Sequence, residues 1–247
     1  MLPKLVCGLV CAALAAQAAD KVVGGPFAVN LSGRSATVVW IVQTGEASIV
    51  AQGATEARTV PTLRAEKVVF RGLKPGVQFS YKVPGEDLSG SFKTPPSGDQ
   101  PFEFVLYGDN RTRPDAHKKV IQAVLAYSHP DFVVQTGDMV ADGADASLWP
   151  VFFDIERELL RHVAFFPSLG NHEHNATDYY DFFQAAPYYS FDWGRRTSPS
   201  LIATWPIPPP PKPPARRSGK SRRPGWKRIC ARARAPGFAS WPRTIRR

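Results

Sequence analysis

Three short polar peptides in the middle of the chain carry residue types suited to binding metal ions. They are Gly108-Asp109-Asn110, Gly137-Asp138-Met139 and Gly170-Asn171-His172-Glu173. Asp109 and Asp138 supply carboxylate oxygens and Asn171 supplies an amide oxygen, all hard ligands for a cation, and each preceding glycine allows a sharp turn. Two cations about 3.5 to 4 Å apart can bridge a hydroxide and hold a phosphate for in-line attack. This set of residues predicts the hydrolysis of phosphate esters.

The elements on either side of these peptides explain how they would meet. Each peptide follows a short run of the length and apolar content of a buried strand, and the runs span residues 102–107, 132–136 and 163–166. Between the runs, residues 114–128 repeat apolar side chains at helical spacing, and a second helical segment begins at Asp145 or Ser147 and closes at Arg161. Crossovers of this length require parallel strands, whose carboxyl ends form one rim. We therefore expect the three peptides to converge.

The peptides and their order along the chain resemble those of the calcineurin-like metallophosphoesterases, within them the purple acid phosphatase type that carries a fibronectin-like domain in front. The resemblance covers residues of about 20 to 194. It implies that Asp109 binds one metal, Asp138 bridges both metals and Asn171 binds the other. It also implies that His172 protonates the leaving group and that Glu173 orients His172. The cofactors implied are two di- or trivalent ions of iron, zinc or manganese, and the substrate implied is a phosphate ester.

Two positions depart from the family pattern. Many members have histidine two residues after the first aspartate, where this chain has Arg111, which we expect to contact phosphate instead. Iron-binding purple enzymes have tyrosine three residues after the second aspartate, where this chain has Ala141. A coloured iron–tyrosinate centre is therefore not expected.

The N-terminal part predicts an exported protein with a separate module in front of the hydrolase. Residues 1–18 have the apolar run and small-residue cleavage site of a secretory signal peptide, and the run is too short to span a membrane. Residues 22–96 alternate apolar and polar side chains and resemble a fibronectin type III β-sandwich. The predicted fold class is therefore α+β with two domains, the sandwich and a partial layered α/β hydrolase over residues 101–194. The expected location is periplasmic or extracellular.

The last part of the chain, residues 195–247, has a different composition. It contains 15 Lys and Arg, 11 Pro and no Asp or Glu, so the net charge of +10 for the whole chain becomes −5 (16 basic against 21 acidic residues) without it. Arg, Pro, Ala and Gly make up 32 of its 53 residues, which is typical of GC-rich DNA translated out of frame. The alternative interpretation is a genuine basic arm that binds nucleic acid or another polyanion.

The histidines bear on whether this chain is active. The family's remaining metal ligands are histidines of two later motifs, and this chain has no histidine after His174. His117, His129 and His162 are interpreted as surface or capping residues, and His174 as solvent-exposed. We therefore expect an incomplete and impaired metallophosphoesterase. The alternative from a different class is a non-catalytic exported binding protein, in which the sandwich binds a partner and the basic tail binds a polyanion.

Overall fold

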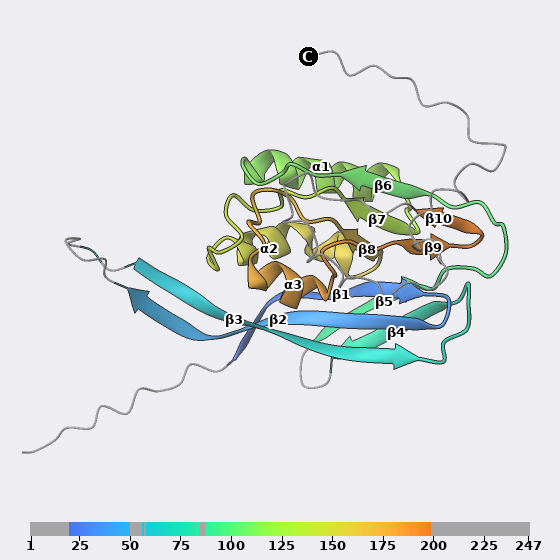
Figure 1. Cartoon of the computed structure of the whole chain (residues 1–247), viewed down its shortest axis with the longest axis horizontal. Helices are drawn as coiled ribbons and strands as arrows, with labels where there is room; N and C mark the ends of the chain where they lie inside the picture. The colour runs from blue at the N-terminus through green and yellow to red at the C-terminus, as the bar shows by residue number, and fades with distance from the viewer. Residues whose placement is uncertain (1–19, 50–55, 57, 84–86, 199–247) are drawn as a thin grey trace, which may run out of the picture.

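The computed structural model describes residues 20–49, 56, 58–83 and 87–198 (Figure 1). The predicted signal peptide and all but the first residues of the predicted tail lie outside these ranges. The elements in chain order are β1 (Lys21–Ser32), β2 (Ser35–Ile49), β3 (Arg58–Arg71), β4 (Gln78–Val83), β5 (Leu88–Lys93), β6 (Phe104–Tyr107), α1 (Pro114–Tyr127), β7 (Phe132–Gln135), α2 (Trp149–Leu160), β8 (Ala164–Pro167), α3 (Thr177–Phe183), β9 (Phe191–Trp193) and β10 (Arg196–Ser198). Within the described ranges, no helix is long and apolar enough to cross a membrane.

One six-stranded sheet runs through the molecule in the order β3-β2-β1-β8-β7-β6 (Figure 1). Strands β6, β7 and β8 are parallel, as their helical crossovers require, with Phe104 opposite Phe132 and Phe132 opposite Ala164. The predicted strand–helix–strand–helix–strand order and the parallel pairing are confirmed.

The N-terminal strands join this sheet instead of forming a module of their own. Strands β1, β2 and β3 pair antiparallel, and β1 also pairs with β8 in parallel through Ala28 and Ala164. Only β4 and β5 form a separate two-stranded sheet. The fibronectin-like sandwich and the two-domain arrangement are therefore not confirmed. Pairing with β1 gives hydrogen-bond partners to a β8 edge that would otherwise be open.

The two crossover helices lie close to their predicted positions. The first covers Pro114–Tyr127, one residue shorter than expected. The second starts at Trp149, because the Asp145 carboxylate accepts hydrogen bonds from the Ser147 backbone N–H (3.1 Å) and hydroxyl (2.6 Å) and so forms a turn before the helix. Its predicted end at Arg161 is confirmed as the C-cap.

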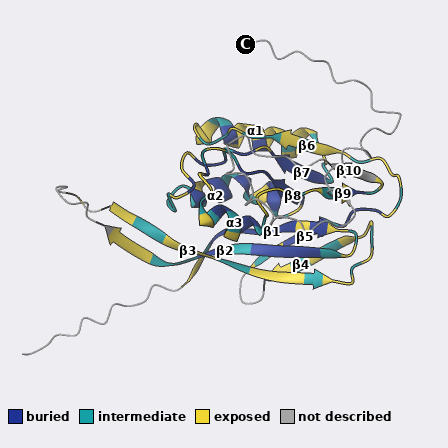
Figure 2. Cartoon of the chain, viewed as in Figure 1, coloured by how far each residue is buried: buried dark blue, intermediate teal, exposed yellow. Residues whose placement is uncertain are grey.

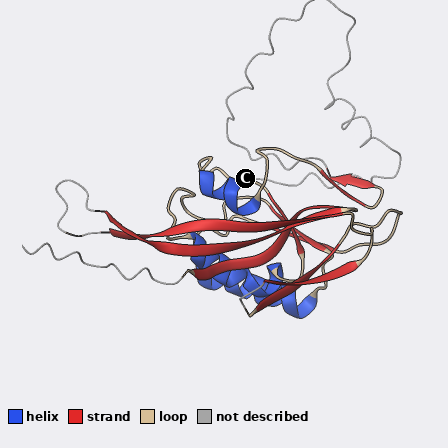
Figure 3. Ribbon diagram, turned by 90° about the horizontal axis from the view of Figure 1, so that it is seen from below, coloured by secondary structure: helices blue, strands red, loops and turns tan. Residues whose placement is uncertain are grey.

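The core has a layer on each face of the sheet, because successive side chains of a strand point to opposite faces. Val133 and Phe165 pack with Trp149 and Phe153 of α2 and Phe183 of α3. The neighbouring strand residues belong to a second cluster, completed by the β4–β5 hairpin and β9; it includes Phe92, Phe132, Val134, Phe166 and Trp193. Figure 3 shows the strands in red with the blue helices packed against the sheet. The two core layers cover the faces of the sheet, and the carboxyl ends of β6, β7 and β8 form a rim outside these layers.

Strand β6 is the edge of the sheet and is the least covered of the three parallel strands. Phe104 and Leu106 are 44% and 57% exposed, whereas all four residues of β7 are buried. Figure 2 shows this contrast as yellow on β6 and dark blue on β7. The edge nearest the first polar turn is therefore the more solvent-exposed side of the hydrolase segment.

Candidate metal centre

The three polar turns meet at the carboxyl ends of β6, β7 and β8, as the sequence predicts. The backbone N–H of Asp109 donates to the Gly137 carbonyl at 3.0 Å, and the N–H of Ser168 donates to the Gln135 carbonyl at 2.7 Å. Asp109 and Asp138 both have a left-handed backbone, with φ of 57° and 58°. Aspartate tolerates this region better than most residues do, and it turns each chain sharply at the end of its strand.

Glu173 ties the second turn to the third. Its fully buried carboxylate accepts hydrogen bonds from four backbone N–H groups, those of Asp138 (3.0 Å), Met139 (2.7 Å), Val140 (3.3 Å) and Gly170 (2.6 Å). Burial raises the pKa of Glu173, and the four N–H donors oppose that shift because they favour the ionised form. This side chain therefore acts as a fixed clamp between two loops.

His172 is oriented by two contacts, neither of them with the Glu173 carboxylate. Its backbone N–H donates to Oδ1 of Asp138 at 3.1 Å, and its ring Nδ1 donates to the Ala141 carbonyl at 2.9 Å. The prediction that Glu173 orients the His172 ring is therefore wrong, because the Glu173 carboxylate is occupied by the backbone. With Nδ1 held by a carbonyl, Nε2 is the ring nitrogen left for proton transfer.

Arg111 lies between the two candidate aspartate ligands. Its Nη1 pairs with Oδ1 of Asp109 and with Oδ2 of Asp138, the latter at 3.0 Å. The sequence predicts a contact of Arg111 with phosphate, and the structure pairs it with the carboxylates. Two carboxylates this close repel each other unless a cation lies between them, and here the guanidinium supplies the positive charge.

The donor set fits one hard cation. Asp109 and Asp138 offer two carboxylates, and the exposed amide of Asn171 makes no hydrogen bond within the described residues, so it is free to bind. In the described part of the chain, no group of three or more His, Cys, Asp or Glu side chains is placed to hold a metal, so these three oxygen donors are the candidate ligands. Binding of one ion requires Arg111 to leave the two carboxylates.

His174 lies near His172 without completing a ligand set. Their ring centroids are 6.1 Å apart, and His174 is exposed, as predicted. The described structure thus brings all six predicted residues together at one rim. Asp109, Asp138 and Asn171 are candidate ligands and His172 is a candidate acid. Arg111 supplies a positive charge, and Glu173 fixes two of the turns.

A buried polar cluster beneath the first turn was missed by the sequence interpretation. His117 is 5% exposed and its Nε2 lies 2.7 Å from Oε1 of Glu156, which is fully buried. The Tyr107 hydroxyl donates to the same carboxylate at 2.7 Å. Burial, then the nearby Glu156 charge, raises the pKa of Tyr107 well above its usual value, so the hydroxyl stays protonated. The interpretation of His117 as a surface residue is therefore wrong.

A signal for this cluster exists in the sequence. Glu156 lies three or four residues from Phe152, Phe153, Leu159 and Leu160, all of them buried residues of α2. An acidic residue in the middle of an apolar helical stripe indicates a buried carboxylate that needs a partner.

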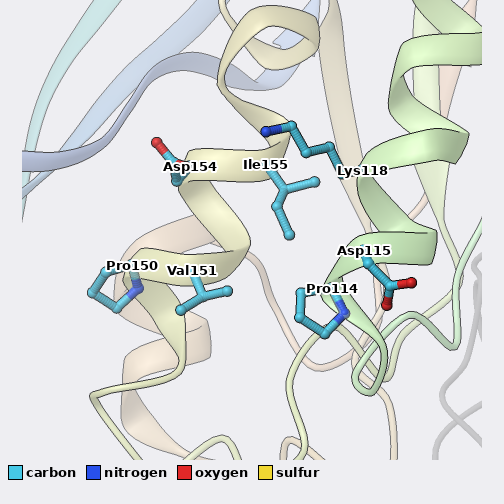
Figure 4. Close-up of a pocket in the computed structure, with 7 residues that line it drawn as sticks. All are labelled: Pro114, Asp115, Lys118, Pro150, Val151, Asp154 and Ile155. Carbon is cyan, nitrogen blue, oxygen red and sulfur yellow. The ribbon is translucent and has the colours of Figure 1, made fainter.

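A hollow between α1 and α2 lies outside the candidate centre (Figure 4). Its volume is about 430 Å³, and it is lined by Pro114, Asp115, Lys118, Pro150, Val151, Asp154 and Ile155. None of the six candidate residues lines it, so the rim of turns remains the candidate site.

Comparisons with curated proteins and with solved structures give different results. No curated protein matches the chain. Among solved structures, a purple acid phosphatase isolated from yellow lupin (Lupinus luteus) seeds is similar, with a TM-score of 0.46, 16% identity, and coverage of 68% of this chain and 43% of that chain. The chain thus spans less than half the length of that protein.

The family comparison places all six candidate residues in one segment. The family model for calcineurin-like phosphoesterases matches residues 102–207, past the boundary predicted at Gly194. Strand β10 also follows that boundary directly. Residues 102–207, which are less than half of the chain, are thus similar to the calcineurin-like phosphoesterases.

Proposed function

We propose that this chain hydrolyses phosphate esters in a metal-dependent reaction at the rim formed by the turns after β6, β7 and β8. The match of residues 102–207 to the calcineurin-like phosphoesterase family supports this proposal. The observation that carries the proposal is the meeting of Asp109 and Asp138, from two different turns, around a single guanidinium. The two carboxylates are thus already arranged around a positively charged group.

Each residue of the rim has a distinct task in this proposal. Asp109, Asp138 and Asn171 hold the cation, and a bound cation supplies Lewis acidity toward a phosphate ester. His172, fixed through Nδ1, delivers a proton from Nε2 to the leaving-group oxygen. The Arg111 guanidinium, if the two carboxylates instead held a cation, would be free to bind a phosphate oxygen.

Glu173 acts in this proposal without transferring a proton. Its carboxylate is saturated by four backbone N–H groups and is fully buried. It holds Asp138 and the turn of Asn171 in place, so it contributes to metal binding through geometry.

The proposed activity is weak. The rim supplies three candidate side-chain ligands, Asp109, Asp138 and Asn171, whereas the family reaction uses two ions, and an ion held by few ligands is bound loosely. We propose that the substrate is a phosphate monoester or a phosphate diester.

Hydrolysis of p-nitrophenyl phosphate and of its bis-ester by the full chain, with Mn²⁺, Zn²⁺ or Fe²⁺ added after chelation, tests the proposal. We expect slow, metal-dependent release of p-nitrophenol that Asp138→Asn and Asn171→Ala abolish. Asp115→Asn, an exposed aspartate of α1, is the matched control and should leave the rate unchanged. A rate that survives chelation or is equal in Asp138→Asn contradicts the proposal.

A second candidate function rests on the charge of residues 195–247, which carry 15 Lys and Arg and no acidic residue. We propose binding to a polyanion such as heparin or DNA through this segment. Binding should weaken steeply with salt and vanish when residues 199–247 are deleted. Binding that survives the deletion contradicts this role.

Export is also proposed from the sequence alone, on the signal-peptide pattern of residues 1–18. Expression of the full gene in a secreting host and mass spectrometry of the N-terminus provide the test. A mature N-terminus at Ala19 supports export, and an intact Met1 in the cytosol contradicts it.

A further inference from the structure

A directed chain of hydrogen bonds runs under the metal centre from the second turn to helix α2. The Gly137 N–H donates to Oε1 of Gln135 at 2.6 Å, and Nε2 of Gln135 donates to Oδ1 of Asn110 at 2.8 Å. Nδ2 of Asn110 lies 3.2 Å from both ring nitrogens of His117, and Nε2 of His117 lies 2.7 Å from Oε1 of Glu156. Five groups from five segments are thus linked in series.

The backbone at one end fixes the direction of every bond in the chain. A Gly137 N–H can only donate, so the Gln135 oxygen must face it and the Gln135 amide nitrogen must face Asn110. The Asn110 oxygen then accepts, and its amide nitrogen points at His117. Because the Glu156 carboxylate accepts from Nε2 of His117, the ring proton lies on Nε2, and Nδ1 is left to accept from Asn110. Reversing any amide would set two donors against each other.

The other end of the chain is a suitable final acceptor. Glu156 is fully buried, and its carboxylate accepts from Nε2 of His117 and from the Tyr107 hydroxyl. A buried carboxylate without donors would be costly, whereas here both partners are donors. Gln135 is also fully buried and His117 nearly so, so water cannot substitute for a lost partner.

The chain connects the two turns that hold the candidate aspartate ligands. Asn110 follows Asp109 directly, and Gly137 precedes Asp138 directly. We propose that His117 and Glu156 are positioning residues that hold the first and second turns at a fixed separation and so set the spacing of Asp109 and Asp138. This inference rests on the proposed metal-dependent function and adds residues on α1 and α2 that touch neither metal nor substrate.

Two variants of His117 separate positioning from simple packing. Gln at position 117 can accept from Asn110 and donate to Glu156, whereas Leu of similar size can do neither. In Mn²⁺ titrations of the full chain by calorimetry, we expect His117→Leu to weaken binding by about 10- to 100-fold and His117→Gln to stay close to the unsubstituted protein. Equal affinities of His117→Leu and the unsubstituted protein would overturn the proposal.

Ile121→Ala is the matched control for loss of stability. Ile121 lies one turn further along α1, is 2% exposed, and takes no part in the hydrogen-bond chain. Its truncation should lower the midpoint of urea unfolding without changing Mn²⁺ affinity. If Ile121→Ala lowers affinity as much as His117→Leu does, the effect is one of stability and the positioning role is wrong.

A measurement without metal keeps this inference separate from the proposed function. ¹⁵N NMR of the histidine side chains should show the His117 proton on Nε2, and amide exchange at Gly137 should be at least about tenfold faster in His117→Leu than in the unsubstituted protein. If the unsubstituted chain binds no Mn²⁺, the proposed function fails while these signals still report on the chain. A proton on Nδ1 of His117, or unchanged exchange at Gly137, overturns the inference.

Discussion

The candidate metal centre has two parts, the first turn and the pair formed by the second and third turns, and they differ in how many hydrogen bonds fix them. The second and third turns share the buried Glu173 carboxylate, which accepts four backbone N–H groups, and the Asp138 side chain is only 16% exposed. The first turn has one backbone bond to the second, from the Asp109 N–H to the Gly137 carbonyl, and the Asp109 side chain is 75% exposed.

This difference shows which half is preformed. Asp138 and His172 are set by interactions that exist without metal or substrate, since the clamp is built from the chain's own backbone. The side chains of Asp109 and Arg111 are placed mainly by charge attraction across the site, so they can rearrange when a cation or a phosphate arrives, while the backbone of the first turn is held through Asn110. Substitutions in the two halves should therefore differ in their effects on stability and on binding.

Glu173→Ala should have the largest effect on stability. It leaves four buried or half-buried N–H groups without an acceptor, so we expect the free energy of unfolding to fall by roughly 3 to 5 kcal/mol, measured by urea titration. Asp109→Asn in the exposed turn is the matched control, because Asn also tolerates the left-handed backbone, with a change within about 0.5 kcal/mol. Equal losses for the two variants would remove the distinction between a firm and an adaptable half.

Gly170→Ala tests the same clamp through its packing. A Cβ at Gly170 would lie 2.1 Å from the Asp138 backbone nitrogen and 2.5 Å from Oε2 of Glu173, so the two turns must separate. We expect a loss of about 1 to 3 kcal/mol in the same titration. Gly45→Ala is the control, because nothing lies within 4 Å of its Cβ. A neutral Gly170→Ala would mean that the two turns move apart freely.

The local elements of the hydrolase segment could be predicted because local pattern determines them. Residues 132–134 are continuously apolar where β7 is buried on both faces, and the lengths of the crossovers are compatible only with parallel pairing. The pairing of β1 with β8 could not be predicted in the same way. It joins Ala28 to Ala164, and the apolar residues of β1 do not specify which strand edge they will pair with.

In the candidate site, too, the local features could be predicted and the contacts between distant segments could not. The three turns could be predicted because carboxylate and amide residues follow the strands. Their meeting could be predicted because the carboxyl ends of parallel strands lie at one edge of the sheet. The hydrogen-bond partners of Glu173 and His172 depend on which way each side chain points within a loop, which residue type and spacing do not specify. The burial of Glu156 could be predicted from the helical spacing of its apolar neighbours. Its pairing with His117 could not, because it depends on how α1 packs against α2.

His172→Ala should have a moderate effect that is mostly on activity. Loss of the bond from Nδ1 to the Ala141 carbonyl should lower the free energy of unfolding by about 1 kcal/mol, because the ring is only partly buried. The backbone N–H bond to Asp138 remains, so Mn²⁺ affinity should hardly change. Hydrolysis of p-nitrophenyl phosphate should fall by about 100-fold or more, the usual contribution of a general acid. A fall in Mn²⁺ affinity equal to the fall in rate would show that His172 binds metal instead of donating a proton.

Arg111→Ala should have the smallest effect on stability and the most informative effect on binding. Its ion pairs with Asp109 and Asp138 are partly exposed, so the free energy of unfolding should change by about 1 kcal/mol or less. Because the guanidinium occupies the carboxylates that a cation needs, its removal should tighten Mn²⁺ binding by roughly fivefold, the equivalent of about 1 kcal/mol. Inhibition by inorganic phosphate should weaken in the same variant, since a phosphate ligand is lost. Lys118→Ala, which removes an exposed cation from α1, is the control for a general change in charge. Weaker Mn²⁺ binding in Arg111→Ala would mean that the arginine organises the two aspartates instead of competing for them, and the first turn would then belong to the preformed half.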